Sequence, residues 1–303
     1  MINKFKVSAV VLNWNNFTDT FECILSLKRS VIPFYKIIMV DNNSTDGSFE
    51  SLYNCLSGDE MIVLIRNKQN VGFAAGVNIG IKIAIDLGSD YIFLINNDAV
   101  IEPNTILCLL EASSNEVGIL GPRIYYYDNR SKIWQGGGYF NYLKAGVSVP
   151  EKNSVREIFT ENTEVSFLTG CAMLISTKCI EDVGLFNENY FFYYEDVDYC
   201  IRASRRGFKL IYVPQAKVYH KIKDVKKERT SPFVFFHLAK SFIIFIYSNF
   251  NALYFLYSIF LHFFIYTPYR IYQVMYGSKD VTSIKAWFKG TIEGLKFVIK
   301  SKR

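Results

Sequence analysis

Short apolar runs alternate with helical stretches through the first hundred residues, and this pattern constrains the fold most. The apolar runs are VSAVVLNW (7–14), KIIMVDNNS (36–44), MIVLIRN (61–67) and YIFLINND (91–98). Stretches with helical character lie between them, at about 18–29, 46–57 and 73–87. Continuous apolar runs are typical of strands buried on both faces, and strands that alternate with helices form βαβ units. The sequence therefore predicts an α/β fold with a mostly parallel sheet flanked by helices.

Each of these four strands ends on asparagine or aspartate, at Asn13, Asp41, Asn67 and the triplet 96–98. In an open parallel sheet the carboxyl ends of the strands meet at one edge, where ligands bind. Asn and Asp also favour turns, so at any single position a turn is the simpler interpretation. Four such ends at one edge favour a binding site. A carboxylate at position 41 can accept a hydrogen bond from the imide N–H of a pyrimidine base.

A second group of carboxylates follows the aromatic run FFYY (191–194) and comprises Glu195, Asp196 and Asp198. Acidic residues in the first turn of a helix suit its macrodipole, which is the structural interpretation. The functional interpretation is that a carboxylate beside aromatic rings acts as a general base, with its pKa raised by desolvation.

The segment NVGFAAGVNIG (70–80) places Gly72, Gly76 and Gly80 at intervals of four. On a helix these glycines form one bare face, which another backbone or a ligand can approach closely. The sequence leaves both interpretations open.

Several enzyme signatures are absent. The sequence has no GxxxxGK[ST], no GxGxxG after the first strand, no HExxH and no GxSxG, which disfavours P-loop ATP hydrolysis and serine hydrolysis. The six cysteines form no CxxC pair, and the first apolar run reads as a strand instead of a signal peptide. We therefore expect reduced, mostly buried thiols in a cytosolic protein.

The last quarter of the chain differs from the rest in charge and hydropathy. Residues 226–303 carry 12 Lys/Arg against 3 Asp/Glu, whereas residues 1–225 carry 22 against 25. Residues 241–267 contain no charged side chain and are long enough to cross a bilayer, although polar residues such as Asn249 and His262 weaken a spanning interpretation. We expect 226–303 to be a basic, aromatic-rich helical tail that associates with a membrane surface.

An amphipathic pattern closes the tail. One helical face carries Val281, Ile284, Phe288, Ile292, Leu295 and Ile299. Lys285, Lys289, Lys296 and Lys300 fall on its flank. Such a pattern is typical of a helix lying in a membrane interface with snorkelling lysines. The alternative is a helix that packs this stripe on the domain's own core.

Seven segments, taken in order, resemble family 2 glycosyltransferases with the GT-A fold, and in particular rhamnosyltransferase-like enzymes of bacterial surface polysaccharide synthesis. They are VVLNWNN, VDNNSTDGS, NVGFAAGVNIG, LINNDAV, FLTGCAMLIS, FFYYEDVDYCIRASRRGF and VYH, and they span about 70% of the chain. The resemblance implies a Rossmann-like GT-A domain over residues 1–225. It also implies inverting transfer of a sugar from a UDP- or dTDP-sugar to a hydroxyl of a glycan acceptor.

The resemblance assigns residues to the donor. The nucleotide-contacting positions are Asn13, Asp41, Asn43, Asn70, Gly72 and Asn97, with Asp41 reading a uracil or thymine ring. Asp98 matches the metal-binding end of an Asp-x-Asp motif, and His220 matches a late histidine that completes the site for Mn²⁺ or Mg²⁺. The motif here begins with Asn96, so one carboxylate fewer implies weaker metal binding before the nucleotide arrives.

The resemblance also implies the catalytic and sugar-binding residues. Asp196 matches the general base, with Glu195 beside it. The acceptor and donor sugars are expected to contact Trp134, Thr169, Gly170, Cys171 and Asp198. Trp134 and the glycines at 136–138 suggest a mobile flap over the site.

Competing functions fit the residues less well. A nucleotidyltransferase would carry a Gly-rich, basic loop where this chain has LNWNNFTDT, and a processive synthase would carry QxxRW, which is absent. A non-catalytic membrane-bound nucleotide-sugar binder or scaffold is the remaining alternative. Nucleic acid is not expected as a partner, because the tail lysines flank an aliphatic stripe and form no stacking surface. The tail favours a polyprenyl-linked acceptor at the cytoplasmic face of the inner or plasma membrane.

Overall fold

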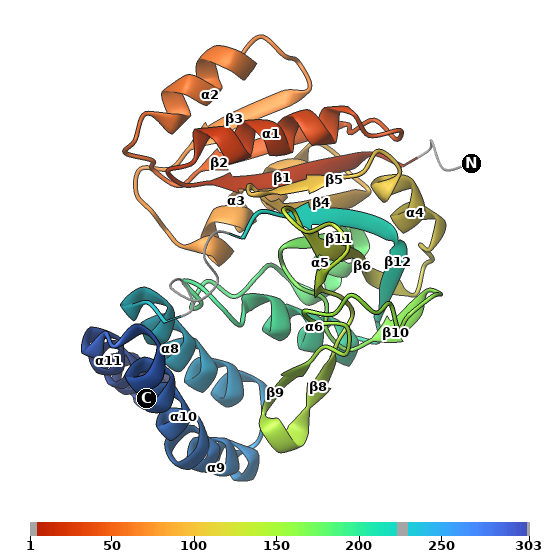
Figure 1. Ribbon diagram of the computed structural model, residues 1–303. Helices are drawn as coiled ribbons and strands as arrows, with labels where there is room; N and C mark the ends of the chain where they lie inside the picture. The colour runs from red at the N-terminus through yellow and green to blue at the C-terminus, as the bar shows by residue number, and fades with distance from the viewer. Residues whose placement is uncertain (1–4, 223–229, 302–303) are drawn as a thin grey trace.

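A twisted sheet with helices on both faces forms the body of the protein in the computed structural model, which describes residues 5–222 and 230–301 (Figure 1). The sheet order is β10-β12-β6-β11-β4-β1-β2-β3, with β5 added to β12 and β7 to β6. The strands are β1 Val7–Asn13, β2 Lys36–Asp41, β3 Ile62–Arg66, β4 Tyr91–Asn96, β5 Ala99–Ile101, β6 Val117–Tyr126, β7 Ile133–Gln135, β10 Thr163–Val165, β11 Ala172–Ser176 and β12 Lys209–His220.

The helices of the body follow the predicted alternation. They are α1 Phe17–Lys28, α2 Ser48–Leu56, α3 Phe73–Asp86, α4 Thr105–Glu111, α5 Thr177–Val183 and α6 Glu195–Arg205. β1 pairs in parallel with β2 and β4, and β2 with β3. β11 runs antiparallel to both β4 and β6, and β12 is parallel to β6. The carboxyl ends of β1–β4 and β12 therefore lie at one edge, which confirms the predicted mostly parallel α/β sheet.

The bare glycine face of α3 packs on the sheet. A Cβ on Gly76 would lie 2.6 Å from Leu12 Cδ1, and one on Gly80 would lie 2.6 Å from Val10 Cγ1. Both distances are too short for any side chain. Helix packing against β1 is therefore what these two glycines serve.

One local expectation is confirmed and another differs from the structure. β2 ends at Asp41, as predicted, because the Asp41 carboxylate accepts a hydrogen bond from Ser44 N at 2.8 Å and Asn43 takes a left-handed conformation, with φ 61°. The glycines at 136–138 are buried, and a Cβ on Gly137 would lie 2.7 Å from Tyr212 Cβ. This part of the predicted flap is wrong, since the glycines allow the chain to pack closely on β12.

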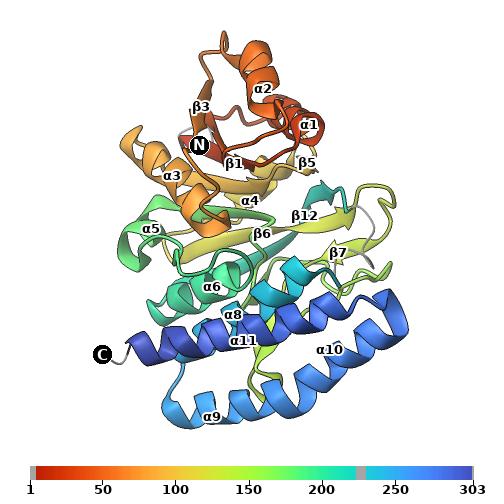
Figure 2. The ribbon, with the colours of Figure 1, turned by 90° about the vertical axis from the view of Figure 1, so that its left-hand side faces the viewer.

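The tail contributes helices α8 Pro232–Asn249, α9 Ala252–Leu261, α10 Thr267–Gln273 and α11 Val281–Ser301. π-helical turns at His262–Tyr266 and Val274–Ser278 join α9 to α10 and end α10. Figure 2 shows α11 running beside α8. A Cβ on Gly290 would lie 2.1 Å from Phe236 O, and one on Gly294 would lie 2.9 Å from Ile243 Cβ, so these two glycines set the close approach of the helices.

The first tail helix is part of the body's core. Residues 242–246 of α8 belong to the same buried cluster as Val10, Ile38 and Tyr199. At its end, Asn249 Nδ2 donates to Asp198 Oδ1 at 2.7 Å. The domain boundary predicted at 225/226 thus falls between segments that share one core.

A hairpin of the body reaches down to the tail. Strands β8 Tyr139–Asn141 and β9 Gly146–Ser148 are joined by a 3₁₀ turn at Tyr142–Lys144. The hydroxyls of Tyr254, Tyr257 and Tyr266 donate to the carbonyl oxygens of residues 142, 143 and 144 in turn. Three successive carbonyls are thereby bonded to the tail.

Candidate active site

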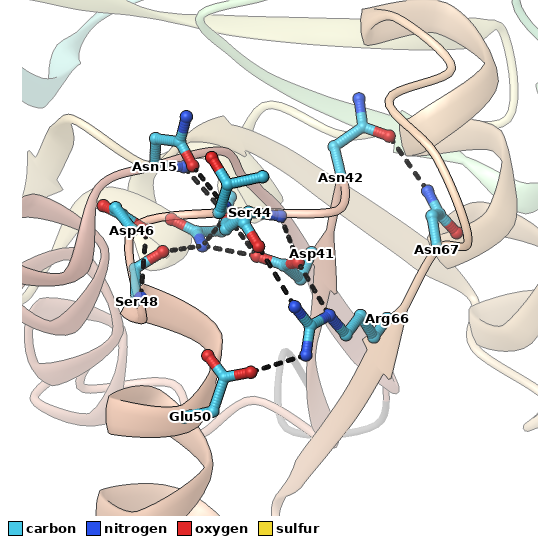
Figure 3. Close-up of polar contacts among 11 residues, drawn as sticks. Asn15, Asp41, Asn42, Ser44, Asp46, Ser48, Glu50, Arg66 and Asn67 are labelled. Carbon is cyan, nitrogen blue, oxygen red and sulfur yellow. Dashed lines mark hydrogen bonds and ion pairs between the residues drawn. The ribbon is translucent and has the colours of Figure 1, made fainter.

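A dense hydrogen-bond cluster fills the carboxyl ends of β1 and β2 (Figure 3). Asp41 is fully buried, and its Oδ1 accepts from Asn13 Nδ2 at 2.7 Å and from Ser44 Oγ at 2.6 Å. Arg66 Nε lies 3.9 Å from Asp41 Oδ2 and also pairs with Glu50. Both predicted nucleotide residues lie at the predicted edge, but their polar atoms are bonded within the chain.

Asn42, which the sequence analysis missed, joins β2 to the loop after β3. Its Nδ2 donates to Asn70 Oδ1 at 2.9 Å and to Gly72 O at 3.0 Å. Its Oδ1 accepts from Asn67 Nδ2 and from Val71 N, each at 3.1 Å. Its position could have indicated this role, because Asn42 directly follows the last residue of a buried strand and precedes a turn. Asn42 thus fixes the predicted nucleotide residues Asn70 and Gly72 beside β2.

The backbone conformation and the close packing at position 72 require a glycine. Its φ is +84°, and a Cβ would lie 2.6 Å from Phe191 O. The next residue, Phe73, donates its N–H to the same oxygen at 2.8 Å. The start of α3 is therefore fastened to the aromatic segment that precedes Glu195.

The residues after β4 meet the end of β12. Asp98 Oδ1 lies 2.9 Å from His220 Nε2, and the Trp134 ring lies 4.4 Å from the His220 ring, edge to face. Burial lowers the pKa of His220, yet Cys171 and Asp98 beside it outweigh burial and hold that pKa well above its ordinary value. Asn97 Nδ2 donates to Thr20 Oγ1 at 2.8 Å. Thus the two predicted metal ligands and Trp134 form one corner.

A turn links this corner to the predicted base. Gly170 N donates to Asp196 Oδ2 at 3.0 Å, and Val197 N donates to Asp196 Oδ1 at 2.8 Å. On the other side of the turn, Cys171 O accepts a hydrogen bond from Asn96 N, at the end of β4, at 2.8 Å. Burial raises the pKa of Asp196, although the two N–H donors oppose the shift. The turn at 169–171 thus lies between the Asp98–His220 pair and Asp196.

The other two acidic residues of α6 have different surroundings. Glu195 is buried, its Oε2 has no hydrogen-bond partner among the described residues, and burial, followed by Asp196, raises its pKa well above the ordinary range. Asp198 is turned away from the site. It accepts from Tyr190 Oη at 3.2 Å and pairs with Arg202 Nε at 2.7 Å. Asp198 therefore holds the fold together, and its predicted contact with a sugar gains no support from this position.

Two consecutive tyrosines enter α6 in a left-handed conformation, Tyr193 with φ 68° and Tyr194 with φ 70°. Such a conformation costs on the order of 1–3 kcal/mol for each non-glycine residue and is concentrated at functional sites. The backbone turns here so that Glu195 and Asp196 begin the helix.

The Asp98–His220 pair fits a divalent metal in part. Carboxylate oxygen with imidazole nitrogen suits Mn²⁺ better than Mg²⁺, which prefers oxygen alone. His220 Nδ1 is buried without a hydrogen-bond partner among residues 5–222 and 230–301. Within the same residues, no group of three or more His, Cys, Asp or Glu is placed to hold an ion. Two protein ligands leave the other positions to a ligand's oxygens.

Two cavities are described away from these groups. A cavity of about 230 Å³ is lined by Glu22, Arg29, Tyr127 and Arg130 and by none of the residues above. Another, of about 180 Å³, lies between the tail and Tyr194.

Comparison with known proteins identifies the family of the sequence and the class of its fold. The model of the family described as glycosyl transferase family 2 matches residues 8–184. N-acetylglucosaminyl-diphospho-decaprenol L-rhamnosyltransferase of Mycobacterium tuberculosis is 29% identical over 242 residues, which cover 73% of this chain and 76% of the relative. The dTDP-rhamnosyl transferase RfbF of Shigella flexneri is 26% identical over 219 residues, covering 72% and 70%.

A solved structure shares the architecture. The crystal structure of GalNAc-T7 with UDP, GalNAc and Mn²⁺ superposes with a TM-score of 0.68 at 15% identity. It covers 98% of this chain, and this chain spans 56% of that one. At this identity the likeness shows the fold, which is that of GT-A glycosyltransferases.

Proposed function

The chain belongs to glycosyl transferase family 2 and is a glycosyltransferase related to rhamnosyltransferases, and we propose that it transfers a sugar, with inversion, from a UDP- or dTDP-sugar to a hydroxyl of a lipid-linked glycan. The observation that carries this proposal is the turn at 169–171, which is hydrogen-bonded to Asp196 through Gly170 and to the end of β4, just before Asp98, through Cys171. A transferase needs such a pairing of a diphosphate-binding corner with a general base.

Asp196 is the general base of the proposed reaction. Its carboxylate takes the proton of the acceptor hydroxyl as that oxygen attacks the anomeric carbon from the side opposite the leaving diphosphate, and this in-line displacement inverts the anomeric configuration. Burial raises the pKa of Asp196, which makes it a better proton acceptor than an ordinary aspartate. The N–H groups of Gly170 and Val197 hold both carboxylate oxygens in place.

Asp98 and His220 would hold Mn²⁺ together with the donor diphosphate. When bound, the metal neutralises charge on the departing nucleoside diphosphate. Asn97 and the Asn42-organised loop around Asn70 and Gly72 frame the nucleotide, and Asp41 is the proposed partner of the base. Asp41 Oδ2 accepts one hydrogen bond, from Ser44 N, and so retains an acceptor site for the base, but Asp41 is fully buried, so base binding requires the 41–44 turn to move.

The tail supports an acceptor at a membrane surface. Large apolar side chains of α9 and its π-helical extension are exposed, including Leu253 at 79%, Leu256 at 64% and Phe264 at 66%. Residues 252–277 are long and apolar enough to cross a membrane by length and composition, and only 17% of their most apolar stretch is buried. In α8, by contrast, 61% of the most apolar stretch is buried, as in a core helix. We propose that the tail lies on the cytoplasmic face of the inner or plasma membrane.

Four of the six residues of the predicted apolar stripe of α11 are exposed, whereas Ile284 and Leu295 are partly buried and pack against the core clusters. Val281, Phe288, Ile292 and Ile299 are each at least 40% exposed. The helix packs on α8 through another face instead, which carries Ser283, Trp287, Gly290, Thr291, Gly294 and Val298. The exposed stripe is available to the same membrane surface.

Replacement of the base tests the transferase. We expect Asp196→Asn to abolish transfer from the true donor, to be found among UDP- and dTDP-sugars by Mn²⁺-dependent thermal shift. Calorimetry should still detect donor binding, because the base acts on the acceptor. Asp86→Asn, a substitution at an exposed end of α3, is the matched control and should keep full turnover. Turnover above a few per cent in Asp196→Asn would remove Asp196 as the base.

A further inference from the structure

Between the tail and the body lies a cavity of about 180 Å³, here called the tail cavity. Its lining includes Tyr194, Phe242, His262, Tyr266, Arg270 and Trp287. Tyr194 comes from the body and directly precedes Glu195 and Asp196, whereas the other five side chains come from the tail. The tail cavity therefore adjoins the start of α6.

Arg270 brings a positive charge to the tail cavity without a carboxylate partner among the described residues. Its guanidinium carbon lies 5.4 Å from the centre of the Phe235 ring and 5.5 Å from that of Trp287. Its Nη1 donates to Gln273 Oε1 at 2.8 Å. The chain has no Asp or Glu from 241 to 279, and burial lowers the pKa of Arg270. Arg270 is thus a partly buried cation with unused donors, to which a ligand can supply the anion.

A second unpaired polar atom belongs to the same lining. His262 is fully buried and stacks on Trp287, with ring centres 4.8 Å apart. Its Nε2 lies 2.9 Å from Thr291 Oγ1, while its Nδ1 has no hydrogen-bond partner among the described residues. Burial lowers the pKa of His262 to about 4, so the imidazole is neutral. Because Thr291 Oγ1 donates its proton to Trp287 O, His262 donates from Nε2, and its Nδ1 can accept a hydrogen bond from a hydroxyl of a ligand.

The helix that carries Arg270 is irregular on both sides. The π-helical turns at His262–Tyr266 and Val274–Ser278 flank α10, and Pro268 cannot donate the hydrogen bond that a regular helix would need there. π-helical turns cost stability and occur frequently at functional sites. Their position around α10 is a further sign that its side chains are placed for binding.

We propose that the tail cavity binds the diphosphate of a prenyl-diphosphate-linked acceptor, with Arg270 as the residue that pairs with it. This inference rests on the proposed function, since it assigns the acceptor's charged group to a place beside the base. A diphosphate beside Tyr194 would bring its attached sugar toward Asp196. The prenyl chain would lie along the exposed apolar residues of α9.

Direct binding tests the tail cavity independently of catalysis. The full chain in detergent micelles is titrated with farnesyl diphosphate, farnesol or inorganic diphosphate, and the fluorescence of Trp287 is followed. We expect farnesyl diphosphate to change the emission, and Trp287→Phe to remove that change. Arg270→Met, which keeps the length of the side chain among aromatic rings, should weaken farnesyl diphosphate binding about tenfold or more. Arg156→Met, at an exposed arginine of the body, should have no effect.

Three results would overturn the proposal. They are farnesyl diphosphate binding that Arg270→Met leaves unchanged, farnesol binding as tightly as farnesyl diphosphate, and inorganic diphosphate binding as tightly as the prenyl form. The last result would assign the cavity to free diphosphate. Thermal unfolding checks that Arg270→Met is folded, which we expect because an apolar side chain replaces an unpaired cation.

Turnover provides a second readout that separates this proposal from the transferase itself. With a prenyl-diphosphate-linked sugar as acceptor, Arg270→Met should raise the acceptor KM about tenfold or more, with the donor KM unchanged. With an uncharged alkyl glycoside of the same sugar, wild type and variant should behave alike. Equal losses on both acceptors would contradict the proposal, even with an active transferase. If farnesyl diphosphate binding depends on Arg270 but the protein shows no turnover, the proposal for the tail cavity is supported and the proposed transferase function is contradicted.

Discussion

Adjacent acidic side chains at the start of α6 experience different constraints. Asp196 receives two backbone N–H donors, whereas Glu195 Oε2 has none among the described residues, although both are desolvated. Burial is the largest cause that raises the pKa of both side chains. The two carboxyl groups therefore differ in their hydrogen-bond donors, and raised pKa values of this kind are frequent at acid–base sites.

The raised pKa of Glu195 predicts a pH-dependent stability. The folded state keeps a proton that the unfolded state releases near pH 4.3, so stability falls as pH rises from there toward the raised pKa. Glu195→Gln mimics the protonated form and should reduce this fall. Melting temperatures of wild type and variant between pH 5 and 8 measure the difference, with the exposed Glu161→Gln as control. Parallel curves for wild type and Glu195→Gln would show that Glu195 does not hold the proton.

The raised pKa of Asp196 predicts a shifted pH–rate profile. The base works only when unprotonated, so kcat/KM should fall as pH decreases through its raised pKa. That limb should lie above the pKa of about 3.9 of an ordinary aspartate. Initial rates at saturating Mn²⁺ over the pH range of enzyme stability measure it. A rate that stays level down to pH 4 would contradict the raised pKa.

At the scale of elements, small residues decide which helices come close. Gly76 and Gly80 bring α3 onto β1, and Gly290 and Gly294 bring α11 onto α8. The second contact leaves Val281, Phe288, Ile292 and Ile299 of the apolar stripe exposed. The helix is thus fixed to the protein mainly by its small-residue face, and these four apolar side chains are available to a membrane surface.

A pair of glycine substitutions tests this packing. Gly290→Ala would place Cβ 2.1 Å from Phe236 O, and the helices must separate, at a cost of about 1–3 kcal/mol in the free energy of unfolding. Gly277→Ala meets nothing within 4 Å and should be neutral or add up to about 1 kcal/mol. Urea unfolding of both variants measures the difference. Equal stabilities would show that α11 does not pack closely on α8.

The sequence predicted these elements unevenly. The ends of the central strands were predicted to within a few residues of the observed ends. Burial on both faces of such a strand leaves a continuous apolar run in the sequence, as at residues 92–95. The glycines at 136–138 were misread as a flap, since a close approach to Tyr212 leaves no trace in the local pattern. For Asp198, the acidic first turn of α6 did not reveal that Arg202 and Asn249 occupy it.

On the scale of the whole molecule, the body and the tail share one core. Residues 242–246 pack with the body, so a truncation before α8 would remove part of that core and does not test membrane binding. The exposed apolar side chains are concentrated further along, on α9 to α11 and at the hairpin tip, where Leu143 is 79% exposed. Figure 1 shows the hairpin and α9 to α11 at one end of the molecule, and this end is therefore suited to a lipid surface.

Point substitutions in the full chain test this surface. The triple variant Leu253→Glu, Leu256→Glu, Phe264→Glu should weaken partition into vesicles with anionic lipid about 100-fold or more, since each inserted side chain contributes about 1.5–3 kcal/mol. Val31→Glu changes an apolar residue of the body that is 56% exposed and serves as control. Vesicle flotation measures both. Undiminished flotation of the triple variant would exclude this surface.

The three tyrosine hydroxyls that bond to the carbonyls of residues 142–144 bear on how such chains are recombined. These hydrogen bonds use only backbone oxygens from the hairpin, but the rings of Phe140 and Tyr142 also pack against Phe250 of the tail. A chimera that receives this tail on another member's body therefore requires a hairpin of the same length with aromatic residues at these two positions. A hairpin shortened by one residue would leave a tyrosine without its acceptor and misalign the graft.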